Sequence, residues 1–113
     1  MLKTDKILKR QVINGLRNIE KISDVIIAYE PVWAIGTGVV PTNKEISSTI
    51  SYIKTIIDNL YPSSNVKIIY GGSVTEKNIK ELMKIDEVSG FLVGGASLNT
   101  KTFLKIIEVV ANQ

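Results

Sequence analysis

Residues 26–38 read IIAYEPVWAIGTG, and two different patterns meet in this stretch. Its apolar beginning belongs to a nearly continuous run over residues 24–29, rich in β-branched side chains, which predicts a buried strand. A single acid, Glu30, stands at the end of that run, and Pro31 and a glycine-containing loop follow it. A carboxylate costs free energy to desolvate, and local structure gives no reason for one here. The stretch therefore predicts a strand that opens onto a functional loop.

Strand and helix periodicities alternate along the rest of the chain. Leu8, Val12 and Leu16 share one face of an amphipathic helix, and Thr42 with Glu45 forms a capping box at the start of another. Such alternation predicts an α/β fold in which helices cover three parallel strands. The expected elements are a helix over 4–21, strand 24–29, helix 42–60, strand 66–70, a helix opened by a second capping box at 73–76, strand 91–93 and a helix from about residue 100.

The loops that follow the three expected strands have unusual sequences. They read EPVWAIGTG at 30–38, GGS at 71–73 and GGASL at 94–98. Parallel strands joined by helices have their carboxyl ends on one rim of the sheet, which is where α/β proteins bind ligands. We therefore expect these three loops to form one site.

Glu30 is a candidate general base of this site. Alternation along the strand puts it on the same face as Ala28, with Tyr29 on the opposite face. Apolar surroundings strengthen a carboxylate as a proton acceptor, so an acid at an apolar rim suits this role. A strand-end acid can also simply face solvent or cap a neighbouring helix, and the residues alone leave that alternative open.

The segment after Glu30 has the composition of a lid. Pro31 and Trp33 are stiff, whereas residues 34–38 are small and permissive. The G-x-G within it does not indicate a dinucleotide-binding fold, because the third glycine is missing and the loop does not join a strand directly to a helix.

Two glycine pairs, 71–72 and 94–95, stand between an expected strand and an expected helix. Glycine lets backbone N–H groups approach a ligand closely, and a helix N-terminus attracts an anion. Ser73 adds a hydroxyl donor. Each pair taken singly is also typical of a tight turn, but together they favour phosphate. The motif of nucleoside triphosphatases, G-x-x-x-x-G-K-[ST], does not occur, so bound ATP is not expected.

Composition excludes several other kinds of site. The 113 residues contain no cysteine and no histidine, which excludes disulfides, thiolate metal sites and cysteine nucleophiles, and we expect no metal and no cofactor. The net charge is +3, but the 14 basic residues are scattered among 11 acidic ones, so no nucleic-acid surface is expected. We see no signal peptide and no apolar run of membrane-spanning length, and expect a cytoplasmic protein with no membrane partner.

Three segments resemble the rim signatures of one family, triosephosphate isomerase, in the same order and at the same spacing. These are AYEPVWAIGTG at 28–38, YGGSV at 70–74 and GFLVGGASL at 90–98. The resemblance extends over the whole chain. It implies the last three βα units of a TIM (β/α)8 barrel, so that residues 1–113 form a partial barrel domain whose N-terminal portion is absent.

The resemblance also implies roles for individual residues. Glu30 is the base that moves a proton between C1 and C2 of glyceraldehyde 3-phosphate and dihydroxyacetone phosphate, through an enediolate, in glycolysis and gluconeogenesis. A closing lid keeps water from the enediolate, which can otherwise lose phosphate. The residues implied are Pro31, Val32 and Trp33 as hinge, Ala34, Ile35, Gly36, Thr37 and Gly38 as lid, and Gly36, Ser73, Gly94 and Gly95 as phosphate-binding residues.

The chain departs from the family in two ways. The family's active-site Asn and Lys, its electrophilic His and its dimer loops belong to the absent portion, so the isolated chain is expected to be inactive although the family is homodimeric. Pro41 has no N–H to give to the hydroxyl of Tyr70, a bond that accompanies lid closure in many members. The alternative interpretation is a non-catalytic α/β remnant that at most binds phosphate or associates with itself.

Overall fold

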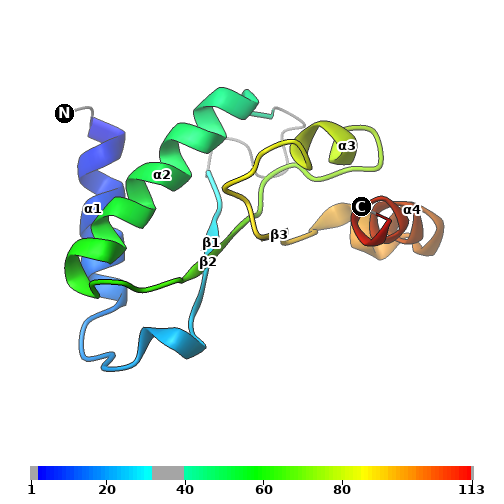
Figure 1. Cartoon of the computed structure of the whole chain (residues 1–113). Coiled ribbons are helices and arrows are strands. Elements are labelled where there is room, and N and C mark those ends of the chain that lie inside the picture. Colours follow the sequence, from blue (N-terminus) through cyan, green and yellow to red (C-terminus); the bar gives the residue numbers. More distant parts are fainter. Residues whose placement is uncertain (1–2, 32–39, 113) are drawn as a thin grey trace.

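The computed structural model of the chain describes residues 3–31 and 40–112. Helices and strands alternate through these residues (Figure 1). The elements are α1 (Lys3–Gly15), β1 (Ile26–Tyr29), α2 (Asn43–Leu60), β2 (Lys67–Tyr70), α3 (Ile79–Leu82), β3 (Gly90–Phe91) and α4 (Thr100–Ala111), with 3₁₀ turns at Ile22–Asp24 and Gly95–Leu98.

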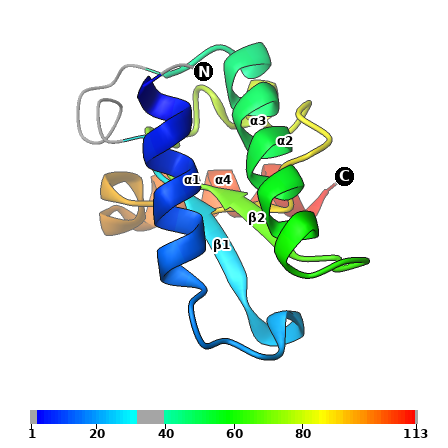
Figure 2. The same cartoon turned by 90° about the vertical axis from the view of Figure 1, so that its left-hand side faces the viewer.

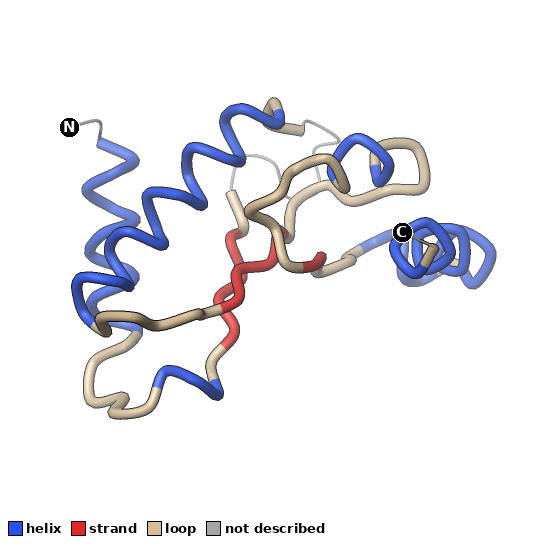
Figure 3. Tube along the Cα trace, in the orientation of Figure 1, coloured by secondary structure: helices blue, strands red, loops and turns tan. Residues whose placement is uncertain are grey.

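The three strands form one parallel sheet, as the alternation of elements predicts, and their order in the sheet is β1-β2-β3. The register pairs Tyr29 with Tyr70 and Tyr70 with Phe91, so the last residues of all three strands lie side by side. Figure 3 shows this short sheet at the centre of the molecule. Both outer strands, β1 and β3, have a neighbour on one side only, and the sheet is therefore open at both edges.

One face of the sheet is covered by helices. Figure 2 shows α1 and α2 in front of β1 and β2, while Figure 1 shows α3 and α4 on the side of β3. The apolar stripe of α2 packs onto this face, and each isoleucine buried there contributes about 1.5–3 kcal/mol relative to an exposed one. The largest fully buried side chains are Tyr70, Ile46, Ile50, Ile57, Ile68, Ile79 and Leu82.

The opposite face of the sheet is bare. Ile26 is 62% exposed and Leu92 45% exposed, and Ala28 and Glu30 are exposed as well. The radius of gyration is 14.6 Å, compared with about 13 Å for a compact domain of this length. The sheet thus has one face covered by helices and one face exposed.

The first helix and first strand are shorter than predicted. Helix α1 ends at Gly15 rather than near residue 21, because glycine is a poor helix former and Asn18 has a left-handed φ of 67°. The hydroxyl of Tyr61 donates to the carbonyls of Leu16 and Ile19 and holds the chain that leaves the helix. Strand β1 begins at Ile26, since residues 22–24 form a 3₁₀ turn.

Of the two predicted capping boxes, the first begins a helix and the second does not. At α2, the Thr42 hydroxyl accepts a hydrogen bond from the Glu45 amide at 3.1 Å, as expected. The box at 73–76 is wrong, because Ser73 precedes a turn and helix α3 starts only at Ile79. The Thr75 hydroxyl accepts from the Asn78 amide at 3.2 Å, and that local arrangement replaces the expected one.

Candidate functional site at the carboxyl ends of the strands

The site begins where the three strands end in register. The Gly71 amide donates to the Tyr29 carbonyl and the Leu92 amide donates to the Tyr70 carbonyl, each at 2.9 Å. Glu30, Gly71 and Leu92 are therefore the first residues beyond β1, β2 and β3, on one rim. The expectation that the strands place these loops together is thus met for the described part of each loop.

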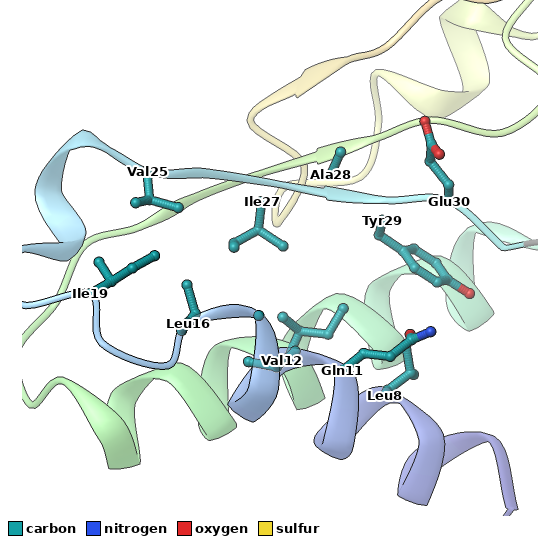
Figure 4. A pocket seen from close by; sticks show the side chains of 12 residues that line it. Leu8, Gln11, Val12, Leu16, Ile19, Val25, Ile27, Ala28, Tyr29 and Glu30 are labelled. Carbon is teal, nitrogen blue, oxygen red and sulfur yellow. The ribbon is translucent and has the colours of Figure 1, made fainter.

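Glu30 lies on the bare face of the sheet, as the alternation predicts. Figure 4 shows its side chain pointing away from the helices, on the side of Ala28, whereas Tyr29 points towards α1 and α2. The side chain is exposed, so the apolar surroundings expected around it are not supplied by residues 3–31 and 40–112. Its Cγ and Oε1 lie 3.1 and 3.2 Å from the position that a Cβ on Gly71 would occupy, so the carboxylate rests directly on the neighbouring rim loop.

The expected phosphate-binding residues of the described loops lie on the same rim. Ser73 is partly exposed after β2, and Gly94 and Gly95 are exposed after β3. A Cβ on Gly94 or Gly95 would meet no atom within 4 Å, so the space above their backbone is open to a ligand. The Ser97 hydroxyl donates to the Gly94 carbonyl at 2.6 Å and closes the turn that follows.

The lid residues of the sequence prediction lie mostly outside the described residues. Val32, Trp33, Ala34, Ile35, Gly36, Thr37 and Gly38 belong to this group. Pro31 is described and is buried at the first position of the expected hinge. Pro41 is also buried, and it precedes the Thr42 cap of α2. The lid and hinge roles stay predictions.

Asn78 is a residue of the site that the sequence reasoning missed. Its side-chain amide donates to the Ser73 carbonyl at 2.6 Å, and its side-chain oxygen accepts from the Thr75 amide at 2.8 Å. These two bonds hold the loop after β2 in one shape and so fix the backbone at Ser73. The signal was present in the sequence as T-x-x-N over 75–78, because Thr and Asn are the residues that bond to local backbone groups.

Two tyrosines lie beneath the rim. Burial raises the pKa of Tyr70, the nearby Tyr29 adds to the increase, and the backbone of Ser73 offsets part of it. Burial also raises the pKa of Tyr29, with a hydrogen bond from Thr49 acting in the opposite direction. The ring centroids are 6.2 Å apart, a tilted aromatic contact. No residue of the described ranges forms a hydrogen bond of ordinary geometry with the Tyr70 hydroxyl.

A cavity of about 430 Å³ lies between α1 and the open edge of β1. Figure 4 shows its walls, which include Val12 of the helix, Leu16 just after it, and Ile27 and Tyr29 of the strand. Its lining is largely apolar, and it opens beside an unpaired strand edge. These features suit a neighbouring strand with its side chains rather than a small polar ligand.

Within residues 3–31 and 40–112, no three His, Cys, Asp or Glu side chains gather as metal ligands would. None of the helices in the same ranges has the length and apolarity to cross a membrane. The arrangement defines a class of protein: a segment of a parallel βα barrel with a carboxylate and glycine-rich loops on the ligand-binding rim.

Comparisons with known proteins identify the family within this class. A sequence profile of the family described as triosephosphate isomerase matches residues 1–110. The chain is 50% identical over 108 residues to the triosephosphate isomerase of Thermodesulfovibrio yellowstonii and 44% identical over 110 residues to that of Clostridium botulinum, covering 94% and 93% of this chain. The crystal structure of triosephosphate isomerase from Bartonella henselae superposes with a TM-score of 0.81 at 31% identity, over 95% of this chain.

The chain belongs to the triosephosphate isomerase family, as the rim signatures predict. It spans 44% of the length of these two curated relatives and 44% of the Bartonella henselae chain. What the whole relatives do is therefore treated below as a proposal for this chain.

Proposed function

We propose that this chain is the C-terminal portion of a triosephosphate isomerase and works only together with the remaining portion of the barrel. The observation that supports this proposal most directly is the position of Glu30. It stands on the bare face of the sheet at the end of β1, on the same rim as Ser73 and the Gly94–Gly95 pair, in a chain of this family. The reaction is the interconversion of glyceraldehyde 3-phosphate and dihydroxyacetone phosphate.

In this proposal Glu30 takes a proton from one carbon of the triose phosphate and returns it to the neighbouring carbon. Removal of a proton from C1 of dihydroxyacetone phosphate forms an enediolate with its negative charge on O2. After a proton passes from O1 to O2, delivery of the first proton to C2 completes the aldehyde isomer. The backbone at Gly36, Gly94 and Gly95, with Ser73, holds the phosphate, and the segment from Pro31 to Gly38 closes over the substrate. Exclusion of water protects the enediolate from loss of phosphate.

The isolated chain is proposed to be inactive. Glu30 can accept a proton, but the 113 residues include no histidine to polarise the carbonyl, and enediolate formation needs a group that stabilises the developing negative charge. In the family these groups come from the portion of the barrel that this chain does not span.

The open sheet supports a requirement for that portion. Because the Tyr29 carbonyl bonds to Gly71 of the loop after β2, the backbone groups of Ala28 and Glu30, one residue to either side, point to the unpaired edge. Beside this edge lies the apolar cavity next to α1, and above it lies the bare face with Ile26. Further strands would pair with the edge, fill the cavity and cover Ile26 in one step.

A complementation experiment tests the proposal. The chain is mixed with a separately produced polypeptide that supplies the remaining portion from the Thermodesulfovibrio yellowstonii relative, and isomerisation and proton exchange at dihydroxyacetone phosphate are followed. We expect turnover in the mixture and none with either piece alone. Glu30→Gln should lower kcat by about 10²–10⁴-fold, because an amide cannot accept the proton.

The matched control is Glu20→Gln, which changes an exposed acid that precedes β1, at the end of the strand opposite the rim, and should leave turnover unchanged. A folded, associated mixture without activity would favour the non-catalytic remnant. Near-normal turnover of Glu30→Gln would disprove the assignment of the base. A cytoplasmic location and the homodimeric assembly of the family stay predictions, which fractionation of the source cells and sedimentation of the complemented enzyme would test.

A further inference from the structure

Gly71, the first residue after β2, lies in contact with the proposed base. A Cβ at this position would stand 3.1 Å from Glu30 Cγ, 3.2 Å from Glu30 Oε1 and 3.0 Å from Leu92 Cβ. These separations are shorter than ordinary van der Waals contacts of about 3.5–4.0 Å between carbon atoms. The Glu30 side chain therefore occupies space that is free only because residue 71 has no side chain.

The backbone of Gly71 does not itself demand glycine. Its φ lies outside the left-handed region, so no left-handed backbone conformation requires glycine there. The adjacent Gly72 differs, because a Cβ there would run into the ring of Tyr70, which belongs to the core. A methyl group added at position 71 would thus contact the Glu30 side chain and Leu92, and not a ring of the core.

We propose that Gly71 is a positioning residue for Glu30, and this inference rests on the proposed function. The missing Cβ lets the carboxylate settle against the β2 loop, and Leu92 bounds the same space from the β3 side. A general base must stand with its accepting atom within about 2.6–3.2 Å of the heavy atom whose proton it abstracts. A methyl group at position 71 displaces the Glu30 carboxyl or Leu92 by a few tenths of an ångström, which moves the base relative to the substrate carbons.

The effect belongs to the chemical step more than to binding. The phosphate-binding residues assigned above in the described loops, Ser73, Gly94 and Gly95, are not among the nearest neighbours of the added methyl group. Misplacement of about 1 Å at a catalytic group costs about 100-fold in rate, and the displacement here is smaller. We expect G71A to lower kcat of the complemented enzyme about 3- to 30-fold and to change KM less than about threefold.

The first test uses the chain alone and does not depend on activity. Nuclear Overhauser contacts between the Gly71 α-protons and the Glu30 γ-protons are measured in the wild-type chain, and in G71A between the introduced methyl group and the same γ-protons. Strong contacts in the wild type, with shifted Glu30 signals in G71A, are expected. G15A is the matched control, since a Cβ at Gly15 meets nothing within 4 Å, and it should leave the Glu30 signals in place.

The second test separates positioning from a general structural effect. In the E30Q background the residual rate no longer depends on where a base stands, so G71A should cause no further loss of kcat there. An equal loss in both backgrounds overturns the proposal, and so does the absence of Gly71–Glu30 contacts in the wild-type chain. Contacts that are present while complementation yields no activity would leave the placement intact and refute the proposed function instead.

Discussion

Replacement of Asn78 by alanine tests how the loop after β2 is held. The Asn78 side chain donates to the Ser73 carbonyl at 2.6 Å and accepts from the Thr75 amide at 2.8 Å, and both bonds are partly buried. N78A removes both partners at once and leaves two backbone groups unpaired. At about 0.5–1.5 kcal/mol for each bond, the free energy of unfolding should fall by about 1–3 kcal/mol.

Urea denaturation followed by circular dichroism measures this loss, and two further variants sharpen it. N99A is the matched control, because the Asn99 side chain accepts one bond, from the Thr102 amide at 3.1 Å at the exposed start of α4. Its removal should cost about 1 kcal/mol, as for other helix caps. N78D keeps the acceptor towards Thr75 but loses the donor towards Ser73, so its cost should be at least that of one bond.

The same change should also weaken substrate binding in the complemented enzyme. Ser73 belongs to the proposed phosphate site, and its backbone is free to move once the bond from Asn78 is lost. KM should therefore rise by more than kcat falls. If N78A costs no more stability than N99A, and KM is unchanged, then the loop is held by other contacts and the reasoning is refuted.

Three further predictions concern other parts of the fold. T42A removes the hydroxyl that caps α2 and should lower the free energy of unfolding by about 1 kcal/mol in urea denaturation, whereas an unchanged midpoint would show that the Glu45 amide finds another partner. The raised pKa values of Tyr29 and Tyr70 mean that the folded chain holds protons which the unfolded chain releases from about pH 10.0 upwards. Their contribution to the free energy of unfolding should therefore be complete below pH 10.0 and be lost as the pH rises through the raised pKa values. Y29F should remove part of the tyrosinate absorbance that appears late in the titration. Coincident titration curves of folded and urea-unfolded chains would contradict this prediction. Ile26→Lys changes a 62% exposed position on the bare face, so it should alter the free energy of unfolding of the isolated chain by less than about 0.5 kcal/mol. It should nevertheless abolish complementation, because the remaining portion of the barrel covers this face. Undiminished activity in the mixture would show that the face is not covered.

The parts of the fold that follow from local chemistry were predictable from the sequence. The Thr42 cap and the start of α4 at Thr100 both agree with the structure. The parallel direction of the strands followed from the alternation of elements, and the side of the strand on which Glu30 lies followed from the period of two. The caps and the face on which Glu30 lies are set by residues that are close in the sequence, and the parallel direction follows from the succession of elements.

The failures arise where distant or competing contacts decide. At residues 73–78 two capping patterns overlap, and the one containing Asn78 forms because its side chain also reaches the Ser73 carbonyl. The early end of α1 depends on Tyr61, more than forty residues away, which holds the following loop. The contact between Gly71 and Glu30 needs the register of two strands, and no pattern within either loop reveals it.

The two open edges of the sheet have a consequence for how copies of this chain meet. One edge is β1 beside α1, the other is β3 beside α4, and all strands run in the same direction. Continuing the parallel sheet between copies joins the first kind of edge to the second, which is a head-to-tail contact. Such contacts close into a ring or extend as a filament instead of ending at a two-fold pair. Self-association along this route thus gives either a closed ring of fixed size or a filament whose length rises with the concentration of the unpaired chain.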